Sequence, residues 1–152
     1  MASYNEQLLR VVDEFQKEHP GPFTSKQVAA FGLGNGRIRP HQGKLLSIVA
    51  EEMSRAMREQ YIKDPQGRSV RAKHVARLVV EGEQKMLWDS IDRAERPFMQ
   101  VAFQQRRQQI VGDCKQLKTD VDSYNENWNS AGAIQMSFNF TADVEELELV
   151  GA

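Results

Sequence analysis

Apolar residues near the start of the chain recur every three or four positions, which places them on one face of a helix. The run His19-Pro20-Gly21-Pro22 then ends this pattern, because proline lacks a backbone N–H and disfavours helical geometry in the residue before it. We therefore predict a first helix over residues 5–18. Its apolar face consists of Leu8, Leu9, Val12 and Phe15.

Two more helices are predicted before residue 61. A short one covers residues 25–31, with Thr24 or Ser25 as its N-cap. The glycine-rich residues 32–36 predict a turn, since glycine and asparagine accept the positive φ values of a tight reversal. Pro40 suits the first position of a third helix over residues 40–60. We expect its apolar stripe in the core: Leu45, Leu46, Val49, Met53, Ala56 and Met57.

Turn residues and β-formers predict two hairpins after the third helix. Asp64-Pro65-Gln66-Gly67 is a strong turn signal and separates residues 61–63 from residues 68–73. Residues 75–80 and 85–88 form a second pair of strands in this interpretation. The fold class is therefore mainly α with a small β component.

The longest predicted helix covers residues 96–125, and its second half carries an apolar seam at heptad spacing. The seam is Ile110, Cys114, Leu117, Val121 and Tyr124, and it extends over about two heptads. It has two interpretations: pairing with a second copy in a homodimer, which we favour, or packing on the N-terminal part of the chain. A polar run, residues 104–109, precedes the seam and indicates either a solvated helix face or a nucleic-acid contact.

The C-terminal part changes character after residue 125. Residues 125–132 have the composition of a linker. Apolar residues then alternate over residues 134–140, as in a half-buried strand. Residues 141–149 indicate a short acidic helix capped at Thr141, or a frayed tail.

Charge is distributed unevenly along the chain. Residues 1–111 hold 18 Lys and Arg against 13 Asp and Glu, a net charge of +5; residues 112–152 hold 2 against 8, a net charge of −6. A basic body with an acidic end is typical of nucleic-acid binders, in which the tail competes with phosphate for the basic surface. Ordinary variation of a solvated surface is the alternative explanation.

Location and chemistry are constrained by what the sequence lacks. No stretch approaches 18 apolar residues and the opening has no apolar signal region, so we expect no membrane association. The single cysteine, Cys114, suits a reducing cytoplasm. His19, His41 and His74 are scattered and have no partner at metal-ligand spacing. We therefore expect no catalytic site, metal or cofactor.

The order helix, short helix, turn, helix, basic hairpin resembles that of winged helix-turn-helix modules. This resemblance covers residues 5–80 and implies that the third helix enters the major groove of double-stranded DNA while the hairpin lies along the backbone. Arginine and glutamine side chains suit base edges, and cations suit phosphates. The expected DNA-binding residues are Arg37, Arg39, His41, Gln42, Lys44, Lys63, Arg68, Arg71, Lys73 and Arg77.

Two further resemblances concern the C-terminal half. Residues 97–145, notably Gln105 to Cys114 and Leu117 to Asn125, look like a family of uncharacterised bacterial or phage proteins, which implies such an origin and says nothing about chemistry. The segment Gln135-Met136-Ser137-Phe138-Asn139-Phe140 resembles peptides that dock on bacterial sliding clamps. That resemblance implies that Gln135, Phe138 and Phe140 are anchors; a core strand is the alternative.

The sequence therefore predicts three segments: a winged-helix-like domain (1–80), a hairpin with the long helix (81–127), and a linker, strand and acidic tail (128–152). We expect a non-enzymatic, cytoplasmic DNA-binding protein, a bacterial or phage regulator, that uses helix 40–60 and a basic wing, 61–77. The alternative is a protein-interaction module that uses helix 96–125 and the tail. Its partner-binding residues are Ile110, Leu117, Val121, Tyr124, Gln135, Phe138 and Phe140.

Overall fold

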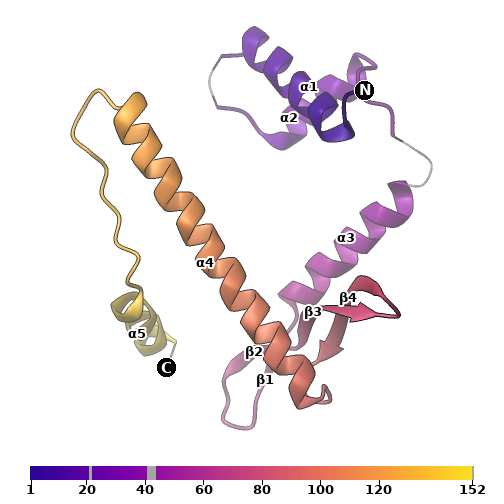
Figure 1. Cartoon of the computed structure of the whole chain (residues 1–152), viewed down its shortest axis with the longest axis vertical. Helices are drawn as coiled ribbons and strands as arrows, with labels where there is room; N and C mark the ends of the chain where they lie inside the picture. Colours follow the sequence, from indigo (N-terminus) through magenta and orange to yellow (C-terminus); the bar gives the residue numbers. More distant parts are fainter. Residues whose placement is uncertain (21, 41–43, 152) are drawn as a thin grey trace. The chain divides into compact units, whose positions relative to one another are not determined.

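Helices dominate the protein, and its strands form two antiparallel hairpins (Figure 1). This confirms a mainly α fold with a small β component. The computed structural model describes residues 1–20, 22–40 and 44–151. The chain forms two units, Met1–Arg55 and Ala56–Ala152, and each is described by itself below.

The first unit contains α1 (Tyr4–Glu18) and α2 (Ser25–Gly34). Each begins with a capping box, in which the N-cap side chain and the third helical residue exchange hydrogen bonds with each other's backbone. Ser3 pairs with Glu6 in α1, and Thr24 pairs with Gln27 in α2, so Thr24 is the cap. The small core between the helices consists of Val11, Phe15 and Val28, with Val12, Phe31 and Ile38 packed against it.

The predicted turn over residues 32–36 is wrong in its first half, because α2 continues through Gly34. Gly32 is buried, and a Cβ at this position would lie 2.5 Å from the Cδ1 of Ile38. Close packing therefore requires glycine at this helical position, and that contact outweighs the tendency of glycine to end a helix. The chain turns at Asn35 and at Gly36, whose φ is +72°.

Helix α3 (Lys44–Glu59) spans the boundary between the two units. Residues 41–43 lie outside the described part of the chain, so its described portion begins at Lys44. The expected core position of its apolar stripe is wrong: none of its residues is buried, and Leu45, Leu46 and Met53 are 69%, 79% and 60% exposed. Helical periodicity defines an apolar face, but it does not supply the element that would cover it.

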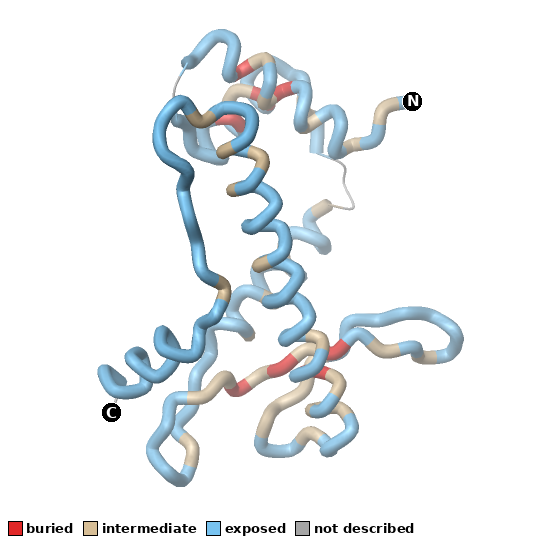
Figure 2. Tube along the Cα trace, turned by 60° about the vertical axis from the view of Figure 1, so that its left-hand side comes forward, coloured by how far each residue is buried: buried red, intermediate tan, exposed pale blue. Residues whose placement is uncertain are grey.

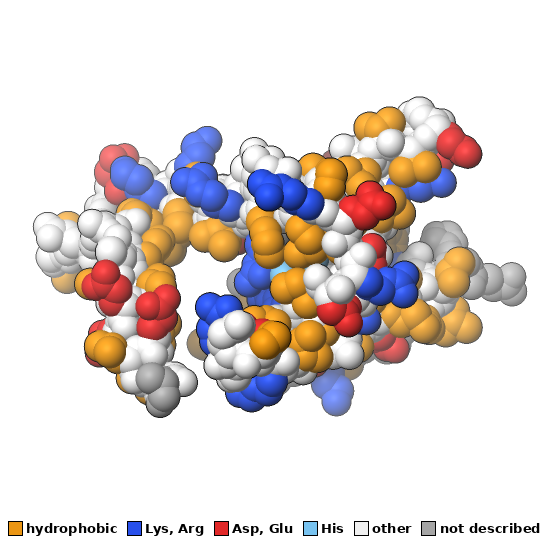
Figure 3. Space-filling view, turned by 90° about the horizontal axis from the view of Figure 1, so that it is seen from below, with side chains coloured by type: hydrophobic (Ala, Val, Ile, Leu, Met, Phe, Trp, Pro, Cys, Tyr) orange, Lys and Arg blue, Asp and Glu red, His pale blue; other side chains and the backbone are white. Residues whose placement is uncertain are grey.

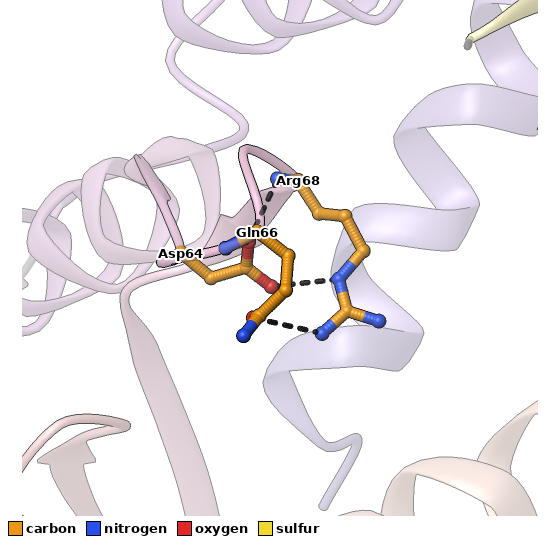
Figure 4. Close-up of polar contacts among 3 residues, drawn as sticks. All are labelled: Asp64, Gln66 and Arg68. Carbon is orange, nitrogen blue, oxygen red and sulfur yellow. Dashed lines mark hydrogen bonds and ion pairs between the residues drawn. The ribbon is translucent and has the colours of Figure 1, made fainter.

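Both predicted hairpins are confirmed. Strands β1 (Tyr61–Lys63) and β2 (Ser69–Arg71) pair around a turn in which Asp64 Oδ1 accepts hydrogen bonds from the backbone N–H groups of Gln66 and Arg68 (Figure 4). Strands β3 (Lys73–Val80) and β4 (Glu83–Ser90) pair throughout their length. Their loop has two residues, not the four predicted. Glu81 and Gly82 have φ values of +52° and +79°, as in a type I′ turn.

Helix α4 (Arg96–Asn127) packs its first turns against β3, which forms the core of the second unit. Ala72, just before the strand, and His74 and Ala76 within it are buried at alternate positions, and Ala102 is buried on the helix. Buried positions of this unit are red in Figure 2. The predicted boundary between segments 1–80 and 81–127 falls inside the β3–β4 hairpin, whose two strands are paired along their whole length.

The predicted strand over residues 134–140 is wrong, since residues 129–140 contain no helix or strand. The segment returns along α4, where its polar backbone groups bond a helix side chain instead of a neighbouring strand. The acidic helix is confirmed as α5 (Thr141–Val150), but its N-cap is Phe140, and no side chain caps it. No helix in the described residues is long and apolar enough to cross a membrane.

Candidate nucleic-acid interface

A basic groove of about 590 Å³ lies in the second unit, between the β3–β4 hairpin and the first half of α4. Among the described residues that line it, none is Asp or Glu. Its cationic residues come from the end of α3, from β2, from β3 and from α4: Arg58, Arg71, Lys73, Arg77 and Arg106.

Strand register explains why the hairpin presents one face to the groove. Val75 lies opposite Trp88, and Arg77 lies opposite Met86. Directly opposed residues share a face of an antiparallel pair, and all four line the groove. Lys73 lies two residues before Val75, and its Nζ donates a 2.8 Å hydrogen bond to Ser90 Oγ. One face of the hairpin therefore carries both charge and aromatic surface.

Helix α4 also lines the groove, through Ala102, Gln105, Arg106, Gln108 and Gln109. Of these, Ala102 and Arg106 are four residues apart, as are Gln105 and Gln109, so each pair lies on neighbouring turns of one side of the helix. The side-chain amide of Gln105 is fixed, because its Oε1 accepts from Arg77 N at 2.7 Å and its Nε2 donates to Arg77 O at 2.9 Å. No such bond involves the amides of Gln108 and Gln109 among the described residues.

His74 lies beneath the groove and is only 7% exposed. Its Nε2 lies 3.1 Å from the carbonyl oxygen of Arg71, and its ring meets the Phe103 ring edge to face, 5.3 Å between centroids. Burial lowers the pKa of His74 below 6.5; the bond to the Arg71 carbonyl opposes this, and the charges of Arg106 and Arg71 lower the pKa further. The neutral ring is therefore favoured.

Arg71 and Arg106 are close enough to influence each other's charge. Burial, and then the positive charge of Arg71, lowers the pKa of Arg106. The guanidinium of Arg58 lies 5.6 Å from the centroid of the half-buried Trp88 ring, at cation–π distance. The groove therefore holds cations that repel one another, and an anion in it would relieve that repulsion.

The structure brings together three of the ten expected DNA-binding residues. Arg71, Lys73 and Arg77 line the groove. Lys63 and Arg68 lie on the β1–β2 hairpin outside it, and Arg68 Nε is bound to Asp64 Oδ2 at 2.7 Å (Figure 4).

The other five expected residues belong to the first unit, which is described separately. Arg37 forms a 2.9 Å ion pair with Glu14, and Arg39 is exposed beside it. The Nζ of Lys44 lies 3.4 Å from the centroid of the Tyr4 ring. His41 and Gln42 lie outside the described residues.

Sequence reasoning missed Arg58, Trp88 and the α4 side of the groove. The polar run over residues 104–109 is a sequence signal for this side, but only Gln105, Arg106, Gln108 and Gln109 of the run line the groove. No sequence signal joined this face to Arg71 or Arg77, because their proximity depends on how α4 crosses β3.

The expected partner-binding residues divide into two groups. Ile110, Leu117 and Tyr124 are exposed along α4. A second cavity of about 430 Å³ between α4 and the C-terminal segment is lined by Val121, Gln135 and Phe138, among others. Phe140 remains exposed, and its ring lies 6.3 Å from that of Phe138.

Comparison of the chain with protein-family models, curated proteins and solved structures gives no match. Within the described part of the chain, no group of three or more His, Cys, Asp or Glu is arranged to hold a metal ion. The chemistry of the groove therefore has to be argued from its own residues.

Proposed function

We propose that this protein binds DNA by holding its phosphate backbone in the basic groove. The observation that carries the proposal is the set of five cationic side chains lining one concavity with no acidic residue among its described lining. Arg68 and Lys118, elsewhere in this unit, are paired with Asp64 and Asp122. The groove cations have no acidic neighbour in the described lining, so they are available to an anion from outside, and a polyanion supplies several phosphates together.

Phosphate binding by these side chains predicts a steep dependence on salt. Each phosphate neutralised on duplex DNA releases condensed counterions and contributes about −0.9 to the slope of log K against log salt. Full use of Arg58, Arg71, Lys73, Arg77 and Arg106 would therefore give a slope of about −4 to −5. Such contacts set affinity and position without reading sequence.

The proposal can be extended from phosphate binding to recognition of the DNA sequence. The order α1, α2, α3 and a basic hairpin is that of a winged helix-turn-helix module, in which the start of the third helix contacts base edges. Arg37, Arg39, His41, Gln42 and Lys44 would then read duplex DNA, as expected of a regulator. The groove supports the proposal independently of this arrangement.

The test is a fluorescence-anisotropy titration of a labelled mixed-sequence duplex at two salt concentrations. We expect Arg71→Ala/Arg77→Ala to weaken binding at least tenfold at low salt and to make the salt slope shallower by about 2. The control is Lys63→Ala/Lys85→Ala, which removes the same charge from the two hairpins outside the groove. An equal loss of affinity in both variants would show a diffuse charge effect and would contradict the assignment of the groove as the binding site.

A second candidate function is protein interaction through α4 and the C-terminal segment. The observation that favours it is the exposed apolar seam: Ile110, Leu117 and Tyr124 are 52%, 44% and 44% exposed. A homodimer would cover the seam. Docking of Gln135, Phe138 and Phe140 on a sliding clamp would require the segment to leave α4, because Phe138 lines the cavity against that helix.

A further inference from the structure

We infer that the groove accommodates an unpaired nucleotide, with its phosphates on the groove cations and its base stacked on Trp88. This inference rests on the proposed function and deepens it, because it names single-stranded nucleic acid, or a duplex with an unpaired stretch, as the preferred ligand. Three observations carry it: the place of Trp88, the amides of α4 that line the same groove, and the size of the groove.

Trp88 lies on the wall of the groove and not on a protruding tip. It is paired in register with Val75 on β3, so the hairpin fixes its position, and it is half-buried. The guanidinium of Arg58, an exposed residue, lies over its ring at 5.6 Å from the centroid. A base could stack on the indole if this long side chain moved toward a phosphate, or it could stack against the guanidinium, which is itself planar.

The position of Trp88 discriminates between paired and unpaired bases. In a duplex the faces of each base are covered by neighbouring base pairs, and only the edges are exposed in the grooves. An indole recessed in a wall cannot enter that stack, so the base has to come to it. A basic channel with an aromatic platform is the arrangement by which proteins hold single strands without strong sequence preference.

The same groove offers polar groups for the edge of a base. Gln108 and Gln109 line the groove, and each amide carries both donors and an acceptor. Gln105 is not available for this task, because both ends of its amide bond the backbone of Arg77. Gln105 is therefore a positioning residue that holds α4 beside the strand, and Gln108 and Gln109 are the base-contacting candidates.

The dimensions of the groove fit a ligand of nucleotide size. Its volume of about 590 Å³ lies within the roughly 300–1,000 Å³ of small-molecule sites. Arg71 and Arg106 lie close enough to His74 for their charges to lower its pKa, so its neutral form is favoured. Positive charge at this end comes from the two arginines, so phosphate binding does not require the imidazole to be protonated.

The experiment uses the full chain with Trp128→Phe, which leaves Trp88 as the only tryptophan. Trp128 is 72% exposed and does not line the groove. We expect a short oligothymidylate to quench Trp88 fluorescence and to bind more tightly than a blunt duplex of equal length at the same salt. In the background that retains Trp128, Trp88→Leu should weaken single-strand binding roughly tenfold, as loss of a stacked base does, and Trp88→Phe should restore most of it.

The outcomes separate this inference from the proposed function. If both ligands bind in a salt-dependent way, but Trp88 fluorescence is not quenched and Trp88→Leu keeps its affinity for the single strand, the inference of an unpaired nucleotide stacked on Trp88 is overturned. The proposal of phosphate binding would remain. Absence of salt-dependent binding to either ligand overturns both. Circular dichroism shows whether Trp88→Leu is folded. If it is not, two other measurements decide whether a base stacks on Trp88: the quenching in the Trp128→Phe chain and the single-strand affinity of Trp88→Phe.

Discussion

The side-chain amide of Gln105 makes with Arg77 the two backbone hydrogen bonds that a neighbouring strand would make. Its oxygen accepts from the Arg77 N–H at 2.7 Å, and its nitrogen donates to the Arg77 carbonyl at 2.9 Å. Arg77 is paired with Met86 on its other side. One glutamine therefore satisfies part of the free edge of β3, and it does so where the helix and the strand together form the groove.

The same device recurs near the other end of α4. The amide of Asn125 donates from Nδ2 to the carbonyl of Ile134 at 2.8 Å, and its Oδ1 accepts from the Ile134 N–H at 3.0 Å. Helix α4 thus holds β3 and the returning C-terminal segment through two amide side chains. Ile134, at the start of the returning segment, is therefore held without a strand partner.

We predict that Gln105→Ala lowers the free energy of unfolding by about 1–2 kcal/mol, since two hydrogen bonds of ordinary net strength are lost. Gln104→Ala is the control, because Gln104 is exposed on the preceding position of the same helix. Urea denaturation followed by circular dichroism measures both. Equal stability of Gln105→Ala and wild type would mean that water replaces the amide at Arg77 without loss.

Stability should depend on pH through His74. Its pKa in the folded protein is lowered below the unfolded value of 6.5, first by burial, so the unfolded chain binds more protons in the window below 6.5. The contribution of His74 is therefore complete above pH 6.5 and is lost as pH falls through the folded pKa. We expect the difference in urea midpoint between pH 7.5 and pH 5.5 to be smaller in His74→Asn than in wild type. An unchanged difference would contradict this assignment.

Patterns local in sequence predicted most elements of the fold. Capping residues, Pro20 and the Asp64 turn act within a few residues of their effects, so their elements could be read directly. The failures are positions decided by tertiary contact. Gly32 stays helical because Val11 and Ile38 approach it, and the alternating residues 134–140 form no strand because the nearest partner is a helix.

The candidate site shows the same division. Arg71, Lys73 and Arg77 could be predicted because a charged hairpin is a local feature. Arg58 and Arg106 could not, since the groove arises where segments separated by tens of residues meet. A polar run on a helix indicates first of all a solvated face, and only the position of α4 beside β3 places part of this run on the groove.

We predict that α5 weakens nucleic-acid binding. The helix carries Asp143, Glu145, Glu146 and Glu148 and no basic residue, and its carboxylates are exposed at the left of Figure 3. Truncation after Phe140 should raise affinity several-fold at low salt and less at high salt, because screening weakens attraction between exposed charges. Anisotropy titrations measure the effect.

The matched control for the truncation keeps the helix and removes its charge, with amides replacing the four carboxylates. If charge competition operates, this variant should bind as the truncated chain does. In an Arg71→Ala/Arg77→Ala background the gain should shrink, because fewer groove cations remain for the tail to occupy. A gain that persists at high salt would point to steric exclusion by α5 and would rule out charge competition.

The apolar seam on α4 predicts self-association. Ile110, Leu117 and Tyr124 are exposed, and Cys114 lies between them in heptad phase. In a parallel, in-register pair the same heptad position of the two helices meets, so two copies of Cys114 would lie close enough for an oxidant to join them. We expect wild type to be a dimer by light scattering at high concentration and to form a disulfide-linked dimer on mild oxidation. Leu117→Glu should be monomeric and should not crosslink, whereas Gln116→Glu, one position away from the seam, should behave as wild type.

Two outcomes would change this interpretation of the seam. A dimer that does not crosslink would indicate antiparallel helices. A wild type that stays monomeric at all concentrations would contradict the homodimer, and the exposed seam would then be a surface for a different protein.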